Sequence, residues 1–140
     1  LAIAAGAADG LGFGANTRAA LITRGLAEIM RLGEAMGGKR ETFMGLAGMG
    51  DLILTCTDDQ SRNRRTGLLL AQGRTLEQIH AEIGQAIEGL KTTRVAVELA
   101  RRYHVELPIT EQVYRVIYEG CPIQDAVHTL LSRRNTQEIA

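Results

Sequence analysis

Apolar residues recur three or four positions apart along most of the chain, which is the spacing of one face of an α-helix. Beyond Asn16 no segment alternates apolar and polar residues with the period of two that a half-buried strand requires. The spacing, together with glycine and proline boundaries, predicts helices at 16–38, 58–73, 75–84, 89–107, 109–120 and from 122 onward. We therefore expect a single all-α domain of roughly seven or eight helices.

The segment 16–38 predicts the longest helix, with Asn16 or Thr17 as its N-cap and Gly37-Gly38 at its end. Its apolar positions cover much of the helix circumference, so we expect it to be central to the core. The preceding residues, from Leu1, could be extended, although a lone strand would have no partner. Farther along, Thr75 and Gln78 have the spacing of a capping box, and Val95, Ala96, Leu99, Ala100 and Tyr103 predict one buried stripe.

Composition narrows the class of protein. Of 140 residues, 45% are hydrophobic and 23% charged, a balance that supports one sizeable core. Sixteen basic residues balance sixteen acidic ones, which argues against nucleic-acid binding and attraction to a membrane surface, and no apolar run is long enough to cross a bilayer. Cys56 and Cys121 form no C-x-x-C pattern and are expected to be buried thiols of a cytoplasmic protein.

Two glycine clusters resemble a dinucleotide-binding loop but lack its context. They are Gly10, Gly12 and Gly14, and then Gly45, Gly48 and Gly50. A dinucleotide fingerprint needs a strand before it and a helix after it, within a βαβ unit, and neither cluster has both. We expect these glycines to provide turns and close backbone approach instead.

Asp51 is the first candidate for chemistry, because it is the only charged residue between Phe43 and Cys56. A carboxylate in an apolar setting costs free energy unless it is paired or hydrogen-bonded. Asp51 could cap a helix over the following Leu-Ile-Leu-Thr segment, or it could belong to a site, and these two roles are compatible.

The second candidate is Ser-Arg-Asn-Arg-Arg, residues 61–65, at the predicted start of a helix. Three arginines there oppose the helix macrodipole and repel one another, and a bound anion would reverse that cost. Hydroxyl, amide and guanidinium groups are suited to holding phosphate. Alternatively, Asp58 and Asp59 neutralise a solvated turn. The three histidines, His80, His104 and His128, lack metal-ligand spacing, and no metal site is predicted.

Three blocks, "GLGFGANTRAALITRGLAE", "TFMGLAGMGDLILTC" and "SRNRR", resemble the C-terminal domain of bacterial-type NAD(P)-dependent glycerol-3-phosphate dehydrogenases. The resemblance covers essentially the whole chain, with the blocks in matching order and spacing. It implies a helical fold like the C-terminal domain of 6-phosphogluconate dehydrogenase, and a substrate-binding domain spanning residues 1–140. The family interconverts sn-glycerol 3-phosphate and dihydroxyacetone phosphate with NAD or NADP, for phospholipid synthesis in the cytoplasm, and its members are often homodimers.

The resemblance also implies roles for individual residues. Asp51, Ser61, Arg62 and Asn63 occupy positions that contact substrate in the family, and Arg62 also reaches the cofactor. Ala86 and Glu88 occupy positions that contact the nicotinamide cofactor, although many relatives carry valine in place of Ala86. We expect Asp51 to orient the lysine that transfers the proton and to tune its pKa.

That lysine belongs, in the family, to an Ala-Leu-Lys-Asn segment just ahead of the residues that match Leu1 onward. We therefore expect both the catalytic lysine and the N-terminal Rossmann domain to precede this chain, and the chain alone to be inactive. Two rival interpretations stay open. One is a helical interaction module with an anion-binding turn, and the other is the helical domain of a different hydroxy-acid dehydrogenase.

Overall fold

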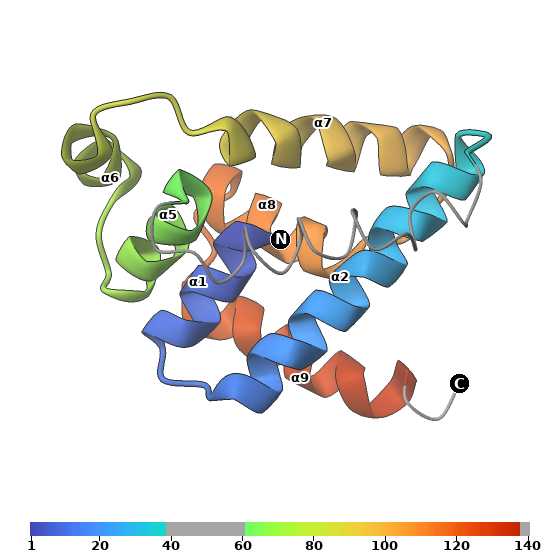
Figure 1. Cartoon of the computed structure of the whole chain (residues 1–140), viewed down its shortest axis with the longest axis horizontal. Coiled ribbons are helices and arrows are strands. Elements are labelled where there is room, and N and C mark those ends of the chain that lie inside the picture. Colours follow the sequence, from blue (N-terminus) through green and yellow to red (C-terminus); the bar gives the residue numbers. More distant parts are fainter. Residues whose placement is uncertain (39–60, 138–140) are drawn as a thin grey trace.

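The computed structural model describes residues 1–38 and 61–137, and every regular element in these two ranges is a helix (Figure 1). This confirms the predicted all-α class. The helices are α1 (Ala2–Gly10), α2 (Ala15–Ala35), α5 (Arg62–Ala71), α6 (Leu76–Ile83), α7 (Glu88–Arg102), α8 (Pro108–Tyr118) and α9 (Ile123–Gln137).

The short helix α1 is the centre of the core, packed against α2, α5 and α8. All seven residues from Ala2 to Ala8 are buried, and a helix that is apolar all round is one that other helices surround. The expectation that the opening residues could be extended is therefore wrong. So is the expectation that the long helix is central, because α2 buries only part of its surface and leaves Ile29 41% exposed.

Glycines let α1 and α5 approach until their backbones touch. A Cβ atom on Gly6 would lie 2.0 Å from the carbonyl oxygen of Arg64, and one on Gly67 would lie 2.0 Å from the carbonyl oxygen of Ile3. Because neither position has room for a methyl group, the crossing tolerates only glycine there. The expected close approach is confirmed at Gly10, where an added Cβ would lie 2.6 Å from that of Ala71.

Helix ends follow the sequence at some points and not at others. The capping box is present, with Gln78 N–H donating to the Thr75 hydroxyl at 3.2 Å, and α6 ends at Gly84 with a left-handed φ of 70°. The long helix α2, however, has Gly14 as its N-cap, two residues before Asn16, and no side-chain cap. The predicted capping role of Asn16 or Thr17 is therefore wrong.

The apolar stripe of α7 differs from the predicted one. Its buried residues are Thr93, Val97 and Ala100, whereas Val95 and Tyr103 are 39% and 38% exposed. The core-facing surface of α7 is the one that packs against α8. Within it, the hydroxyl of Thr93 donates a hydrogen bond to the Gly89 carbonyl at 2.6 Å. That bond lets a polar residue take a core position, so periodicity of apolar residues alone misplaced the stripe.

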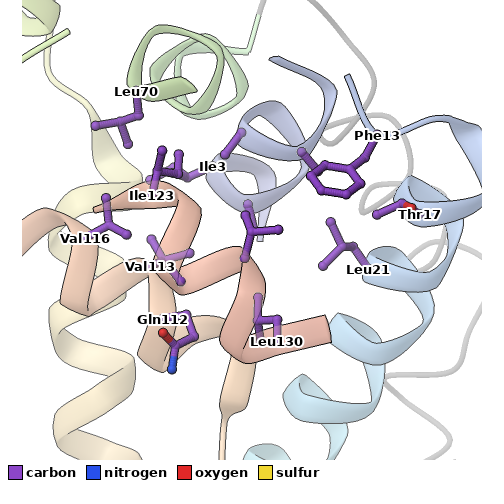
Figure 2. Close-up of a pocket in the computed structure, with 15 residues that line it drawn as sticks. Ile3, Phe13, Thr17, Leu21, Leu70, Gln112, Val113, Val116, Ile123 and Leu130 are labelled. Atoms are coloured by element: carbon purple, nitrogen blue, oxygen red, sulfur yellow. The ribbon is translucent and has the colours of Figure 1, made fainter. Parts of the chain in front are cut away.

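A cavity of about 80 Å³ lies between α1, α2, α8 and α9 (Figure 2). Its walls are almost entirely apolar and include Ile3, Phe13, Leu21 and Val113. Gln112 reaches it from α8. Among the side chains that the structure describes, Gln112 carries the one buried polar atom without a hydrogen-bond partner, its Oε1.

Candidate functional site

The first turn of α5 holds three of the predicted site residues and begins at a well-formed cap. Ser61 is the N-cap, with extended backbone, and its Oγ accepts a hydrogen bond from Arg64 N–H at 3.2 Å. Arg62 and Asn63 are the first two helical residues, and their backbone amides have no carbonyl partner within the helix. The turn thus offers amide hydrogens at the positive end of a helix, as an anion site requires.

Asn63 joins this turn to the start of α7. Its Oδ1 accepts a hydrogen bond from Gly89 N–H at 2.8 Å, and α7 has no cap from its own N-cap residue, Ile87. A Cβ atom on Gly89 would lie 2.5 Å from Oδ1, so the contact depends on glycine at that position. The NH₂ group of Asn63 is left as a donor for a further partner.

Arg62 makes a second link to the same loop. Its NH1 donates to the carbonyl oxygen of Ala86 at 3.1 Å, while the side chain remains exposed. Ala86 and Glu88 are also exposed, and Ile87 between them is buried and anchors the loop. Arg62, expected to contact both substrate and cofactor, and Ala86, expected to contact the cofactor, therefore lie side by side, although they are 24 positions apart.

Arg64 has a different role from Arg62. Its guanidinium is buried and its NH1 lies 2.7 Å from Oδ2 of Asp9, which also accepts from Arg18 NH1 at 3.2 Å. The carboxylate of Asp9 on α1 thus offsets part of the positive charge at residues 61–65. Asp58 and Asp59, the predicted neutralising residues, lie outside the described ranges. Asp9 is not among the site residues predicted from the sequence, although one signal marks it, since it is the single charged residue among the first sixteen.

A cavity of about 200 Å³ lies beside the turn, between α1, α2, α7 and α8. Asn63 and Gly89 line it on one side and Glu28 on another. Burial raises the pKa of the Glu28 carboxyl above its ordinary value, although hydrogen bonds from Ile109 and Thr110 act in the opposite direction. The cavity therefore connects the α5 turn to a buried acidic group that the sequence analysis did not single out.

The other candidates contribute less to this site. Asp51 and Cys56 fall outside the described residues. Cys121 is only half-buried, so the expectation of a buried thiol is wrong for it. His80, His104 and His128 are exposed, and in the described ranges no group of three His, Cys, Asp or Glu side chains could hold a metal ion. None of the helices at 1–38 and 61–137 is long and apolar enough to cross a membrane.

Comparison with known proteins gives a consistent result. Residues 1–128 match the family model of the NAD-dependent glycerol-3-phosphate dehydrogenase C-terminus. The chain is 65% identical over 133 residues to a glycerol-3-phosphate dehydrogenase [NAD(P)+] of Methylococcus capsulatus, covering 95% of this chain and 40% of that protein. A Nitrosococcus oceani enzyme of the same name is 60% identical over 140 residues, covering 100% of this chain and 41% of that protein.

A solved structure shares the fold. The crystal structure of glycerol-3-phosphate dehydrogenase from Coxiella burnetii superimposes with a TM-score of 0.89 at 55% sequence identity, over 93% of this chain and 40% of that one. The chain thus spans about 40% of the length of the relatives it matches.

Proposed function

Because the chain belongs to the family of NAD-dependent glycerol-3-phosphate dehydrogenase C-terminal domains, we propose that it is the helical substrate-binding part of such an enzyme. The reaction is the interconversion of sn-glycerol 3-phosphate and dihydroxyacetone phosphate with NAD or NADP as cofactor. The proposed setting is phospholipid synthesis in the cytoplasm, by an enzyme that forms a homodimer.

The observation that carries this proposal is how the α5 turn uses its hydrogen-bonding atoms. The Ser61 oxygen accepts from Arg64 N–H, and the Asn63 oxygen accepts from Gly89 N–H. Beside these two bonds, the hydroxyl of Ser61, the NH₂ of Asn63 and the guanidinium of Arg62 are donors that a ligand can meet. A surface of donors at a helix N-terminus selects an acceptor-rich anion, and the phosphate of the substrate is such a group.

In the proposed mechanism these donors hold the phosphate and thereby align the carbon that reacts. Binding energy from the unreactive phosphate is then used for orientation of the reacting centre. Asp51, in the part of the chain the structure leaves undescribed, is proposed to orient and tune a lysine that precedes Leu1 and transfers the proton at the substrate oxygen. The dinucleotide-binding domain is likewise proposed to precede this chain.

We propose that the exposed loop at the start of α7 contacts the nicotinamide cofactor. Ala86 and Glu88 are exposed on either side of the buried Ile87, and Arg62 holds the Ala86 carbonyl while four of its five N–H donors remain for other acceptors. When bound, the cofactor supplies or accepts the hydride. Arg62, Ala86 and Glu88 are the residues of this chain that we propose to hold it, next to the phosphate site.

The proposal is tested with a chimeric enzyme in which this chain replaces the matching 40% of the Methylococcus capsulatus relative. Steady-state reduction of dihydroxyacetone phosphate is measured for it and for Asn63→Asp. The substitution keeps an oxygen for Gly89 N–H but replaces the NH₂ donor with a second carboxylate oxygen. We expect KM for dihydroxyacetone phosphate to rise more than about tenfold, from one lost charge-assisted hydrogen bond and added repulsion.

Asn16→Asp is the matched control, because it makes the same chemical change at an exposed position of α2. Its KM is expected to stay within about twofold of the parent, which corresponds to a few tenths of a kcal/mol. A chimeric enzyme without activity on dihydroxyacetone phosphate would contradict the proposed function. An active one in which Asn63→Asp leaves KM unchanged would contradict the assigned role of the turn.

A further inference from the structure

Asp9 and Arg64 each sit at the end of a helix that disfavours their charge. Asp9 lies in the last turn of α1, where the macrodipole is negative, and Arg64 lies in the first turn of α5, where it is positive. Their side chains are only 15% and 9% exposed, so solvent does little to relieve either cost. The 2.7 Å contact between Arg64 NH1 and Asp9 Oδ2 offsets both unfavourable placements at once.

The main chain of Arg64 is held as closely as its side chain. Its carbonyl lies against Gly6, where an added Cβ would be 2.0 Å away, one helical turn before Asp9 on α1. The first turn of α5 is therefore attached to α1 at two points, the glycine crossing and the ion pair. Gly67 and Gly10 make further close contacts between the same two helices, and the ion pair adds to them in fixing the rotation of α5 about its own axis.

That rotation governs the three residues proposed to bind substrate. Residues two apart on a helix point to nearly opposite sides, so Arg64 facing α1 turns Arg62 away from α1. Arg62 and Asn63 then reach Ala86 and Gly89 at the start of α7. The ion pair also commits one of the clustered arginines to a carboxylate, so that Arg64 does not compete with Arg62 for an anion.

We propose that Asp9 is a positioning residue for the phosphate site, which acts through Arg64 to set the rotation of the α5 N-terminus and so aims Arg62 and Asn63 at the substrate. The proposal rests on the proposed function. Arg18 of α2, 3.2 Å from the same oxygen of Asp9, holds the carboxylate from its other side. Asp9 thereby ties α1, α2 and α5 together behind the site without touching the ligand.

The test uses the chimeric enzyme with Asp9→Asn, which keeps the size of the side chain and removes its charge. Two substrates are compared, dihydroxyacetone phosphate and dihydroxyacetone, which lacks the phosphate. We expect KM for dihydroxyacetone phosphate to rise about tenfold, the size of one charge-assisted hydrogen bond. The kcat/KM for dihydroxyacetone should change less than about threefold, so the preference for the phosphorylated substrate falls. A purely structural defect would lower the activity on both substrates in proportion.

Arg64→Lys provides a second variant should Asp9→Asn fail to fold. It keeps the positive charge but replaces the planar fork by a point charge, so the turn is held less firmly. The preference for dihydroxyacetone phosphate over dihydroxyacetone is expected to fall at least about threefold. Glu82→Gln is the control, because it removes an exposed ion pair with Arg74 away from the α5 turn and should leave the preference unchanged.

The outcomes separate this inference from the proposed function. If the parent chimeric enzyme does not reduce dihydroxyacetone phosphate, the proposed function fails and the inference fails with it. If the parent is active and the substrate preference is unchanged in Asp9→Asn, the positioning role is overturned while the proposed function stands. Should Asp9→Asn not fold, an unchanged preference in Arg64→Lys overturns it in the same way.

Discussion

Glu28 and Ile109 are joined by a hydrogen bond that spans 81 positions of the sequence, with Ile109 N–H donating to Oε1 at 2.5 Å. The amide and hydroxyl of Thr110 donate to Oε2 at 3.4 Å and 3.2 Å. Helix α8 has no cap from Leu107, and Pro108 at its first position has no N–H. Glu28 therefore supplies, from α2, the acceptors that the first turn of α8 lacks.

We expect Glu28→Gln to destabilise the chain by about 1–3 kcal/mol at pH 5, because one oxygen becomes an NH₂ group that faces the donors of Thr110. Urea denaturation followed by circular dichroism measures the change. Glu98→Gln, which makes the same change at an exposed position of α7, is the control. Equal stability of parent and Glu28→Gln would show that the carboxylate is not the cap.

The difference in stability between the parent and Glu28→Gln should depend on pH. Burial raises the pKa of the Glu28 carboxyl above 4.5, so the folded chain binds this proton more tightly than the unfolded chain does. The stabilising contribution of Glu28 is then full below about pH 4.5 and is lost as the pH rises through the raised pKa. Denaturation between pH 4 and 8 should show the parent losing its advantage over Glu28→Gln, and an advantage that grows with pH would refute this.

Gly67→Ala tests the crossing of α1 and α5. The new Cβ would lie 2.0 Å from the Ile3 carbonyl oxygen and 2.6 Å from Ala7 N, and both are backbone atoms that cannot turn aside. We expect a loss of about 3 kcal/mol or more in the free energy of unfolding. Gly14→Ser is the control, since it places a larger side chain in open space at an N-cap and should change stability by less than about 0.5 kcal/mol.

Gln112→Leu tests the apolar cavity beside α8. The Gln112 Oε1 is buried without a partner, and leucine fills similar volume without the cost of a desolvated amide. We expect the free energy of unfolding to rise by about 1 kcal/mol, measured by the same denaturation. Gln124→Leu, at an exposed position of α9, should have no such effect, and a destabilised Gln112→Leu would show that the amide has a role in the core.

Arg62→Ala in the chimeric enzyme tests the proposed charge of the phosphate site. Loss of the guanidinium removes charge-assisted hydrogen bonds to the ligand, and we expect kcat/KM for dihydroxyacetone phosphate to fall about a hundredfold or more. Arg102→Ala, exposed at the far end of α7, should reduce kcat/KM by less than about twofold. Similar losses in both variants would mean that the cluster at 61–65 is not the phosphate site.

Much of this structure could be predicted because it depends on interactions between residues that are close in the sequence. The all-α class follows from 3.6-residue periodicity, and the Thr75 cap, Gly84 terminus and Ser61-led turn depend on atoms within four residues of one another. The unusual basic turn was visible for the same reason, since a helix start that carries three arginines opposes its own dipole.

By itself, then, the sequence determined the helical class, several helix boundaries and the donor groups offered by Ser61, Arg62 and Asn63. Tertiary structure alone decided that α1 rather than α2 is central, because the burial of a helix depends on how many other helices surround it. The small residues of α1 allow α5 to approach it most closely. It also decided that Arg64 pairs with Asp9 and that Asn63 holds Gly89. These contacts join residues 55 and 26 positions apart, and no local spacing encodes which donor such an acceptor will meet.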